Sequence, residues 1–317
     1  MNINSNIKYI IGILLLILLP FLINNEYLLH LLIMGGIYTL LVSGLNLIVG
    51  YIGQLSLCHP AFFGIGAYTT GLLFKRLSTP FLLNFLLAGI ITAIISIGFG
   101  YITLRVRGSA FIIMTVSFLH IMHLLVLNEV DFTMGQKGIS GIPNINILGY
   151  NFNTKTSYYY LILILCLFTL FIIYRLVNSE IGRAWKAIRD NENLAKSIGI
   201  NVFKFSNFAF VSGAFIAGLA GSIYAYYINY ISPDLFLFSI TTTLLVMLIM
   251  GGKGTILGPV IGAIIFTLLP EYLRFISEWR MPVFGVILIL GILFFPRGLF
   301  SIKEILSMKM KKKEVSS

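Results

Sequence analysis

FLLNFLLAGIITAIISIGFGYITL, residues 81–104, is a run of 24 residues without a charged side chain. A helix needs about 20 apolar residues to cross the hydrocarbon core of a bilayer. Inside the bilayer no water is present to bond the backbone, so a helix is the expected structure because it pairs its own N–H and C=O groups. The run is therefore predicted to be one membrane-spanning helix.

The rest of the chain has the same character. The 317 residues are 58% hydrophobic and 10% charged, and the mean hydropathy is +0.96, whereas a soluble domain carries about 25% charged residues. No water-soluble fold could bury this much apolar surface. The composition predicts an all-α polytopic membrane protein that contacts the lipid bilayer. Its net charge of +11 is attributed to cytoplasmic loops and lipid headgroups, and no nucleic-acid partner is expected.

About ten transmembrane helices are predicted when the chain is divided at charges and at Pro, Gly and Asn clusters. They form a single transmembrane domain over residues 1–317. The third span contains Pro60, Gly64 and Gly66 and is predicted to be broken. The ten spans are 9–24, 28–50, 56–74, 81–104, 109–127, 157–177, 205–229, 236–251, 257–275 and 283–298.

The basic residues predict the orientation. If ten helices cross and the N-terminus is inside, 16 Lys and Arg lie in the cytoplasm and 6 outside, while the acids divide 5 to 6. This asymmetry of basic residues alone is what the positive-inside rule describes. Both termini are therefore predicted to be cytoplasmic, with a cytoplasmic segment at 178–204, an outer loop rich in glycine at 128–156 and a basic cytoplasmic tail at 301–317.

Several kinds of chemistry are missing from the sequence. No acid lies in the middle of a predicted span, although secondary transporters usually bind their driving ion with such a group. A stand-alone secondary transporter stays open as an alternative, since carbonyls and hydroxyls can also bind Na⁺. No Ser-His-Asp set, paired carboxylates or Cys/His cluster is recognisable, and GGKGT at 251–255 lacks the spacing of a phosphate loop. The chain is predicted not to be an enzyme and to need no cofactor or metal.

Uncharged polar residues and glycines gather in SGLNLIVGYIGQLSLCHPAFFGIGAY, residues 43–68. Polar groups at membrane depth must face protein or a water-filled path. A helix interrupted by proline and glycine is a common sign of a substrate pathway. The small residues Gly213, Gly218 and Gly221 are instead expected to serve helix packing. The residues predicted to line a translocation path are Asn46, Gly53, Gln54, Ser56, His59, Phe62 and Gly64.

One long charged stretch, RAWKAIRDNENLAKSIGIN at 183–201, lies among the apolar segments. Within it, residues 190–197 are predicted to form a short amphipathic helix along the membrane face. Asp190 is expected to cap its start, with Glu192 in the first turn, and Gly199 is expected to end it. The alternative interpretation is an ordinary cytoplasmic loop whose basic residues only set the orientation.

Several motifs together resemble a known family. They include GLNLIVGYIGQLSLCHPAFFGIGAYTTGLL, LRVRGSAFIIMTVSF, GISGIP, IGRAWKAIRDNENLAKSIGIN, MLIMGGKGTILGPVIGA and FFPRGLF. In this order they resemble the permeases of branched-chain amino acid ABC importers, and more closely the M-type than the H-type subunit. The resemblance covers about residues 40–300.

This resemblance implies one half of a heterodimeric pore in the plasma (inner) membrane. A sister permease would form the other half, two cytoplasmic ATPase subunits would drive transport, and an extracytoplasmic binding protein would deliver Leu, Ile or Val. A permease for urea or short amides is the alternative within the same family. The residues expected to couple to the ATPase are Arg183, Lys186, Arg189, Asp190, Asn191, Glu192, Ala195 and Gly199.

Overall fold

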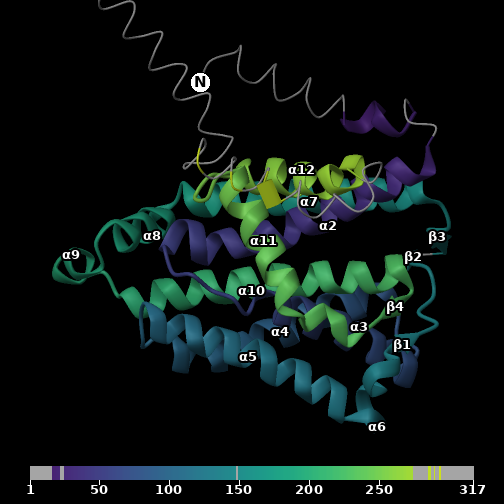
Figure 1. Cartoon of the computed structure of the whole chain (residues 1–317), viewed down its shortest axis with the longest axis horizontal. Helices are drawn as coiled ribbons and strands as arrows, with labels where there is room; N and C mark the ends of the chain where they lie inside the picture. Colours follow the sequence, from purple (N-terminus) through teal and green to yellow (C-terminus); the bar gives the residue numbers. More distant parts are fainter. Residues whose placement is uncertain are drawn as a thin grey trace, which may run out of the picture.

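The long helices run along a common axis, and short segments close both ends of the bundle (Figure 1). The computed structural model describes residues 16–21, 25–147 and 149–273 and positions 285, 286, 289 and 293. Most of span 9–24, most of span 283–298 and the tail 301–317 therefore lie outside the described residues.

In chain order the helices are α2 (Glu26–Asn46), continued by a π-helical segment η1 (Leu47–Ile52), α3 (His59–Leu77), α4 (Phe81–Thr103), α5 (Ser109–Asn128), α6 (Val130–Thr133), η2 (Gly135–Lys137), α7 (Lys155–Val177), α8 (Glu180–Asp190), α9 (Glu192–Ser197), α10 (Val202–Ile228), η3 (Pro233–Phe236), α11 (Phe238–Gly251) and α12 (Gly258–Tyr272).

Five of the described helices are long and apolar enough to cross a membrane. They are α2 with η1, α4, α5, α7 and α10, and α11 and α12 are shorter apolar helices. The exposed face of α4 is made of Leu82, Leu86, Ile90 and Ile94, which is the apolar surface that a lipid-facing helix needs. The sequence-predicted spans in this part of the chain correspond to these helices and to α3.

Helix α10 lies at the centre of the bundle and packs against α2, α3 and α4. Small residues permit the close approach. A Cβ at Gly66 of α3 would overlap the backbone of Gly218, and one at Gly213 would meet the carbonyl of Gly44 in α2. The carbonyl oxygen of Ala88 in α4 lies 2.8 Å from the place of a Cβ at Gly218. The packing role predicted for the glycines of α10 is confirmed.

Two connections inside the bundle interrupt its α-helices. The first, residues 53–58, begins at Gly53 (φ +83°) and leads to the start of α3 beside the middle of α10. The second leads from the end of α10 through η3 to α11. The segment 53–58 is bonded to two helices: Thr241 Oγ1 of α11 donates to the carbonyl of Leu57 at 3.1 Å, and the N–H of Leu57 donates to Thr115 Oγ1 of α5 at 3.2 Å. Side-chain hydroxyls thus satisfy the backbone that no helix pairs.

The predicted break inside the third span is wrong. Helix α3 runs without interruption over Pro60, Gly64 and Gly66, because the proline lies in the first turn, where no backbone hydrogen bond is lost. The actual break lies earlier, in residues 53–58. The two glycines leave room for neighbours: the Phe236 ring occupies the place of a Cβ at Gly64.

The outer loop predicted at 128–156 is folded and covers one end of α10. It contains α6, η2 and three strands of two residues: β1 (Ile139–Ser140), β2 (Asn146–Ile147) and β3 (Tyr150–Asn151). β1 pairs antiparallel with β4 (Tyr230–Ile231), with Ile139 opposite Ile231, and β2 pairs with β3. Apart from these short strands the described residues are mostly helical. We call this end of the bundle the strand end.

The opposite end carries α8 and α9 (Figure 1), and it holds most of the described basic residues. We call it the basic end. At the strand end the described basic residues are Lys75, Arg76, Lys137 and Lys155. Those at the basic end are Arg105, Arg107, Arg175, Arg183, Lys186, Arg189, Lys196, Lys204 and Lys253.

Candidate functional site

Helix α8 is strongly amphipathic and lies against the basic end of the bundle. Its buried face contains Gly182, Ala184, Trp185 and Ile188. Trp185 is fully buried, and its Nε1 donates to the carbonyl of Phe205 in α10 at 2.9 Å. The opposite face exposes the predicted coupling residues Arg183, Lys186 and Asp190. One face of α8 is therefore fixed to the bundle and the other is free.

Helix α9 is the outermost element at this end (Figure 1). Asn191 is extended (φ −159°) and its Oδ1 accepts from the N–H of Leu194 at 3.0 Å. Asn191 is thus the cap, and the predicted cap, Asp190, is the last residue of α8. Asp190 cannot cap α9 because it belongs to α8 (Glu180–Asp190), a helix that was not predicted from the sequence.

The C-terminal end of α9 agrees with the sequence. Gly199 has φ +85°, its N–H donates to the carbonyl of Lys196 at 3.0 Å, and the N–H of Ile200 donates to that of Ala195 at 3.0 Å. These two bonds define a Schellman motif, in which glycine is favoured because its φ is positive. The predicted end of the helix is confirmed.

The side chains of α9 point in directions that the sequence did not reveal. Ala195 is 1% exposed and belongs to the core, so it contacts the bundle and offers no surface to a partner. Leu194 and Ile198 are 62% and 67% exposed. They are four residues apart and therefore lie on one face of the helix. Two exposed aliphatic residues in a short polar helix are the signal that sequence reasoning missed.

Arg189, a predicted coupling residue, is 38% exposed at its side chain yet contacts the bundle. Its Nη1 donates to the carbonyl of Gly50 in η1 at 3.2 Å. Its Cγ lies 3.0 Å from the place that a Cβ at Gly53 would occupy. Arg189 therefore fixes the end of α8 to the point where η1 stops.

Arg107, in the connection between α4 and α5, was not among the predicted site residues. Its Nε lies 2.7 Å from Glu192 Oε2 in α9. When the Gln54 amide is oriented with its oxygen towards Arg107, that oxygen accepts from Nε at 3.0 Å and from Nη1 at 3.1 Å. Burial lowers the pKa of Arg107, and the carboxylate of Glu192 opposes this shift. Arginine stays protonated in proteins, so the pair is an ion pair.

Asn46, predicted to line the path, has its amide bonded within the chain. Its Nδ2 donates to the carbonyl of Thr255 at 2.7 Å, and its Oδ1 accepts from the N–H of Gly254 at 2.8 Å. The side chain is 1% exposed. Asn46 therefore holds the turn between α11 and α12, and its place on a path stays a prediction.

The other predicted path residues are packed among the helices of the bundle, except for Gly53, which is exposed. His59 lies beside Gly44 and Gly213. The ring of Phe62 meets those of Phe118 and Phe210 at centroid distances of 5.6 and 5.4 Å. The buried members are Gln54, Ser56, His59, Phe62 and Gly64.

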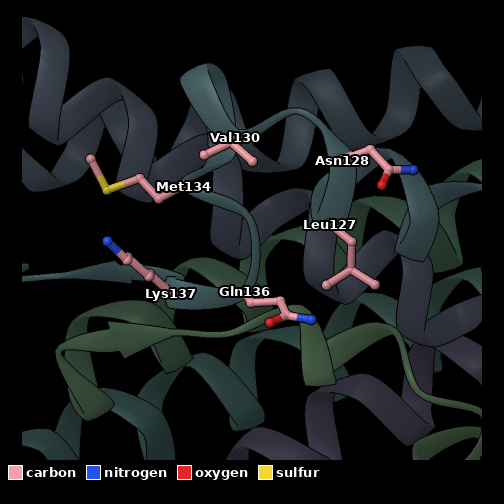
Figure 2. Close-up of a pocket in the computed structure, with 6 residues that line it drawn as sticks. All are labelled: Leu127, Asn128, Val130, Met134, Gln136 and Lys137. Carbon is pink, nitrogen blue, oxygen red and sulfur yellow. The ribbon is translucent and has the colours of Figure 1, made fainter.

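A hollow of about 630 Å³ lies at the strand end, far from α8 and α9 along the bundle (Figures 1 and 2). Figure 2 shows Leu127 at one side of the hollow and Met134 and Lys137 at the other. Its lining combines apolar and polar side chains. Sequence reasoning did not identify it, because most of its residues come from the loop that was expected to be irregular and the others from the end of α5. They are Leu127, Asn128, Val130, Met134, Gln136 and Lys137.

Comparison with known proteins gives consistent results. Residues 27–292 match the family model described as "Branched-chain amino acid transport system / permease component". The chain is 32% identical over 289 residues to the high-affinity branched-chain amino acid transport system permease protein LivM of Salmonella typhimurium, covering 84% of this chain and 68% of the relative. It is 31% identical to LivM of Escherichia coli, covering 83% and 67%. Identity to the permease protein LivH of Escherichia coli is 27%, covering 86% and 94%. No solved structure matches the chain.

Proposed function

Because this chain belongs to the branched-chain amino acid transport permeases, as a multi-pass membrane protein of the M type, we propose that it forms half of the translocation path of an ATP-driven importer. The observation that carries the proposal is the arrangement of α8 and α9. One face is fixed to the bundle, and the exposed Leu194 and Ile198 extend beyond it. A helix presented in this way fits a groove on a partner protein.

We further propose ten membrane-spanning helices with both termini in the cytoplasm of a cell with an inner membrane. The concentration of basic residues at the end with α8 and α9 supports this orientation, since cytoplasmic loops are enriched in Lys and Arg. In this orientation the segment 178–204 and the tail 301–317 face the cytoplasm. The loop 128–156 and the strand end face outward.

The proposed partner of α9 is a cytoplasmic ATPase subunit, one of two. Leu194 and Ile198 would enter its groove, and the exposed Arg183, Lys186 and Asp190 would surround the contact. The remaining predicted coupling residues act from inside the chain. Asn191 caps α9, Ala195 packs it against the bundle and Gly199 ends it. Arg189 is bonded to the carbonyl of Gly50, and Glu192 pairs with Arg107. Closure of the ATPase pair would then move the helices attached to α8 and α9.

The translocation path is proposed to run between this chain and a sister permease. Exposed polar side chains in a membrane span are expected to face protein or water. Helix α11 exposes Ser239, Thr242 and Thr243, whereas α4 exposes aliphatic side chains. We propose that the hydroxyls of α11 and the exposed Gly53 lie towards the path. The buried residues predicted for the path form the packed wall behind it.

Leucine, isoleucine and valine are the proposed solutes, delivered at the strand end by an extracytoplasmic binding protein. The test is uptake into proteoliposomes that contain this chain, its sister permease and both ATPases, with the binding protein outside and ATP inside. Labelled leucine is expected to accumulate with ATP and not with a non-hydrolysable analogue. Uptake of urea or acetamide in place of the three amino acids would contradict the substrate. Uptake by this chain alone on an ion gradient would contradict the mechanism.

Replacing Leu194 and Ile198 by aspartate is expected to separate the ATPases from the permeases. Each change would place an unpaired charge in an apolar groove, and residues central to an interface contribute about 2 kcal/mol or more. Leucine uptake and copurification of the ATPases should both fall by more than about tenfold.

The matched control for this pair is Val130→Asp, an equally exposed aliphatic residue of α6 at the strand end. It should leave copurification of the ATPases unchanged. Retention of the ATPases by the Leu194→Asp, Ile198→Asp variant would show that α9 is not the docking element.

A further inference from the structure

We propose that Arg107 is a positioning residue that links α9 to the non-helical segment 53–58, so that a displacement of α9 reaches the break between α2 and α3. The proposal rests on the proposed function, in which α9 meets an ATPase. No contact between α9 and α3 is needed for it. The link consists of three side chains: Glu192, Arg107 and Gln54.

The first contact joins α9 to the connection between α4 and α5. Arg107 Nε and Glu192 Oε2 are 2.7 Å apart, and both side chains are mostly shielded, with exposures of 30% and 24%. The other oxygen of Glu192 lies 2.8 Å from Lys196 Nζ. Because Lys196 and Glu192 are on the same helix, their pair orients the carboxylate towards Arg107 without tying α9 to anything else.

The second contact joins Arg107 to the segment 53–58. With the Gln54 amide turned so that its oxygen faces Arg107, that oxygen accepts from Arg107 Nε and Nη1, and Gln54 is 6% exposed. The carboxylate and the amide share the single N–H of Nε, and Nη1 donates to the amide in addition. A lysine ammonium would hold the two groups less precisely because its donors have no fixed fork geometry. Arg107 thereby spans the two elements.

The position of Gln54 explains why such a link matters. Gln54 follows Gly53, whose positive φ ends η1 and begins the non-helical segment. On the other side of Gly53, the carbonyl of Gly50 is held by Arg189 of α8. Two arginines thus connect the coupling helices to the two sides of one glycine, and relative motion of α8 and α9 would change the backbone at Gly53.

An ion pair that served stability alone would not need this placement. Partly exposed pairs contribute little to stability, and Lys196 already neutralises Glu192. The expected consequence of breaking the link is therefore a loss of coupling. ATP hydrolysis should continue while solute uptake per ATP falls.

The experiment exchanges the two charges in the complete transporter in proteoliposomes. Arg107→Glu and Glu192→Arg are compared with the double variant, all in a Lys196→Gln background that avoids a new repulsion in α9. Each single variant should lower leucine uptake per ATP hydrolysed by about tenfold. The double variant should recover it to within about threefold, because the Gln54 amide can turn and donate to the carboxylate at position 107.

Lys196→Gln alone is the matched control, since it removes the other ion pair of Glu192 without touching the link. It should keep the wild-type ratio of uptake to hydrolysis. Gln54→Leu, a milder change, covers the case in which the charge reversals fail to assemble, and it should also lower the ratio.

The outcomes separate this inference from the proposed function. If the complex with the wild-type chain shows no ATP-dependent uptake, the proposed function and the role of Arg107 are both overturned. If that complex transports and the Arg107→Glu and Gln54→Leu variants keep its uptake per ATP, only the role of Arg107 is overturned. Failure of the double variant to recover, in assembled protein, would do the same.

Discussion

The Gly66→Leu variant is expected to yield little folded protein. Gly66 lies on the face of α3 that meets α10, and a Cβ there would overlap the backbone of Gly218. A backbone obstacle cannot rotate away as a side chain can, so the two helices would have to separate. Overpacking costs about 1–3 kcal/mol even where side chains can adjust, and this contact should lie at or above the upper limit. The measurement is the amount and thermal stability of the monodisperse protein in detergent.

Gly98→Leu provides the matched control. Gly98 lies in α4, and a Cβ there meets no atom within 4 Å. The control adds the same leucine to another membrane helix and should leave yield and melting temperature close to those of the wild type. Equal behaviour of the two variants would contradict the close packing of α3 on α10.

Much of the helical architecture could be predicted from the sequence because it depends on local properties. The uncharged run 81–104 became α4 (Phe81–Thr103), and span 109–127 became α5 (Ser109–Asn128). Length and the absence of charge determine where a segment can cross a bilayer. The folded strand end could not be foreseen, because its strand β1 pairs with β4, some 90 residues further along the chain.

The break in the third span shows a second limit. Pro60 and the nearby glycines were interpreted as the interruption, yet they lie inside an intact α3. Whether a glycine bends a helix or admits a neighbour depends on what lies opposite. Here Phe236 and Gly218 lie opposite Gly64 and Gly66, and a single sequence does not reveal those partners.

In the charged stretch 183–201 the sequence predicted the short helix near 190–197 and its glycine end. It predicted neither α8 nor the directions of the side chains. Arg189 contacts Gly50, which is 139 positions away, and Glu192 contacts Arg107. Charge in the sequence indicated a surface facing the cytoplasm. In the structure two of these charged side chains face the bundle, and the surface left for a partner is partly aliphatic.

Helix α8 is held to the bundle by Trp185 more than by any charged side chain. Trp185 is fully buried, its ring is stacked on that of Phe208 at 6.2 Å and tilted against that of Tyr51 at 6.4 Å, and its Nε1 is bonded to the carbonyl of Phe205. Truncation of a buried tryptophan to alanine costs about 3–5 kcal/mol. A peripheral helix of 11 residues depends on such contacts, since isolated helices of this length are marginal in water.

Trp185→Ala is therefore expected to release α8 from the bundle while the membrane helices stay folded. Backbone amides of residues 180–190 should exchange with solvent about a hundredfold faster or more, as measured by hydrogen–deuterium exchange and mass spectrometry. ATP-dependent uptake should be lost as well, since α9 would no longer have a fixed base.

Tyr174→Ala, which removes an exposed ring from α7, should change neither the exchange rate of α8 nor the uptake. Trp185→Phe should retain most of the protection, because it keeps the ring contacts and loses only the hydrogen bond. Unchanged exchange in Trp185→Ala would mean that α8 is held mainly by Arg189 and the ends of α7 and α10.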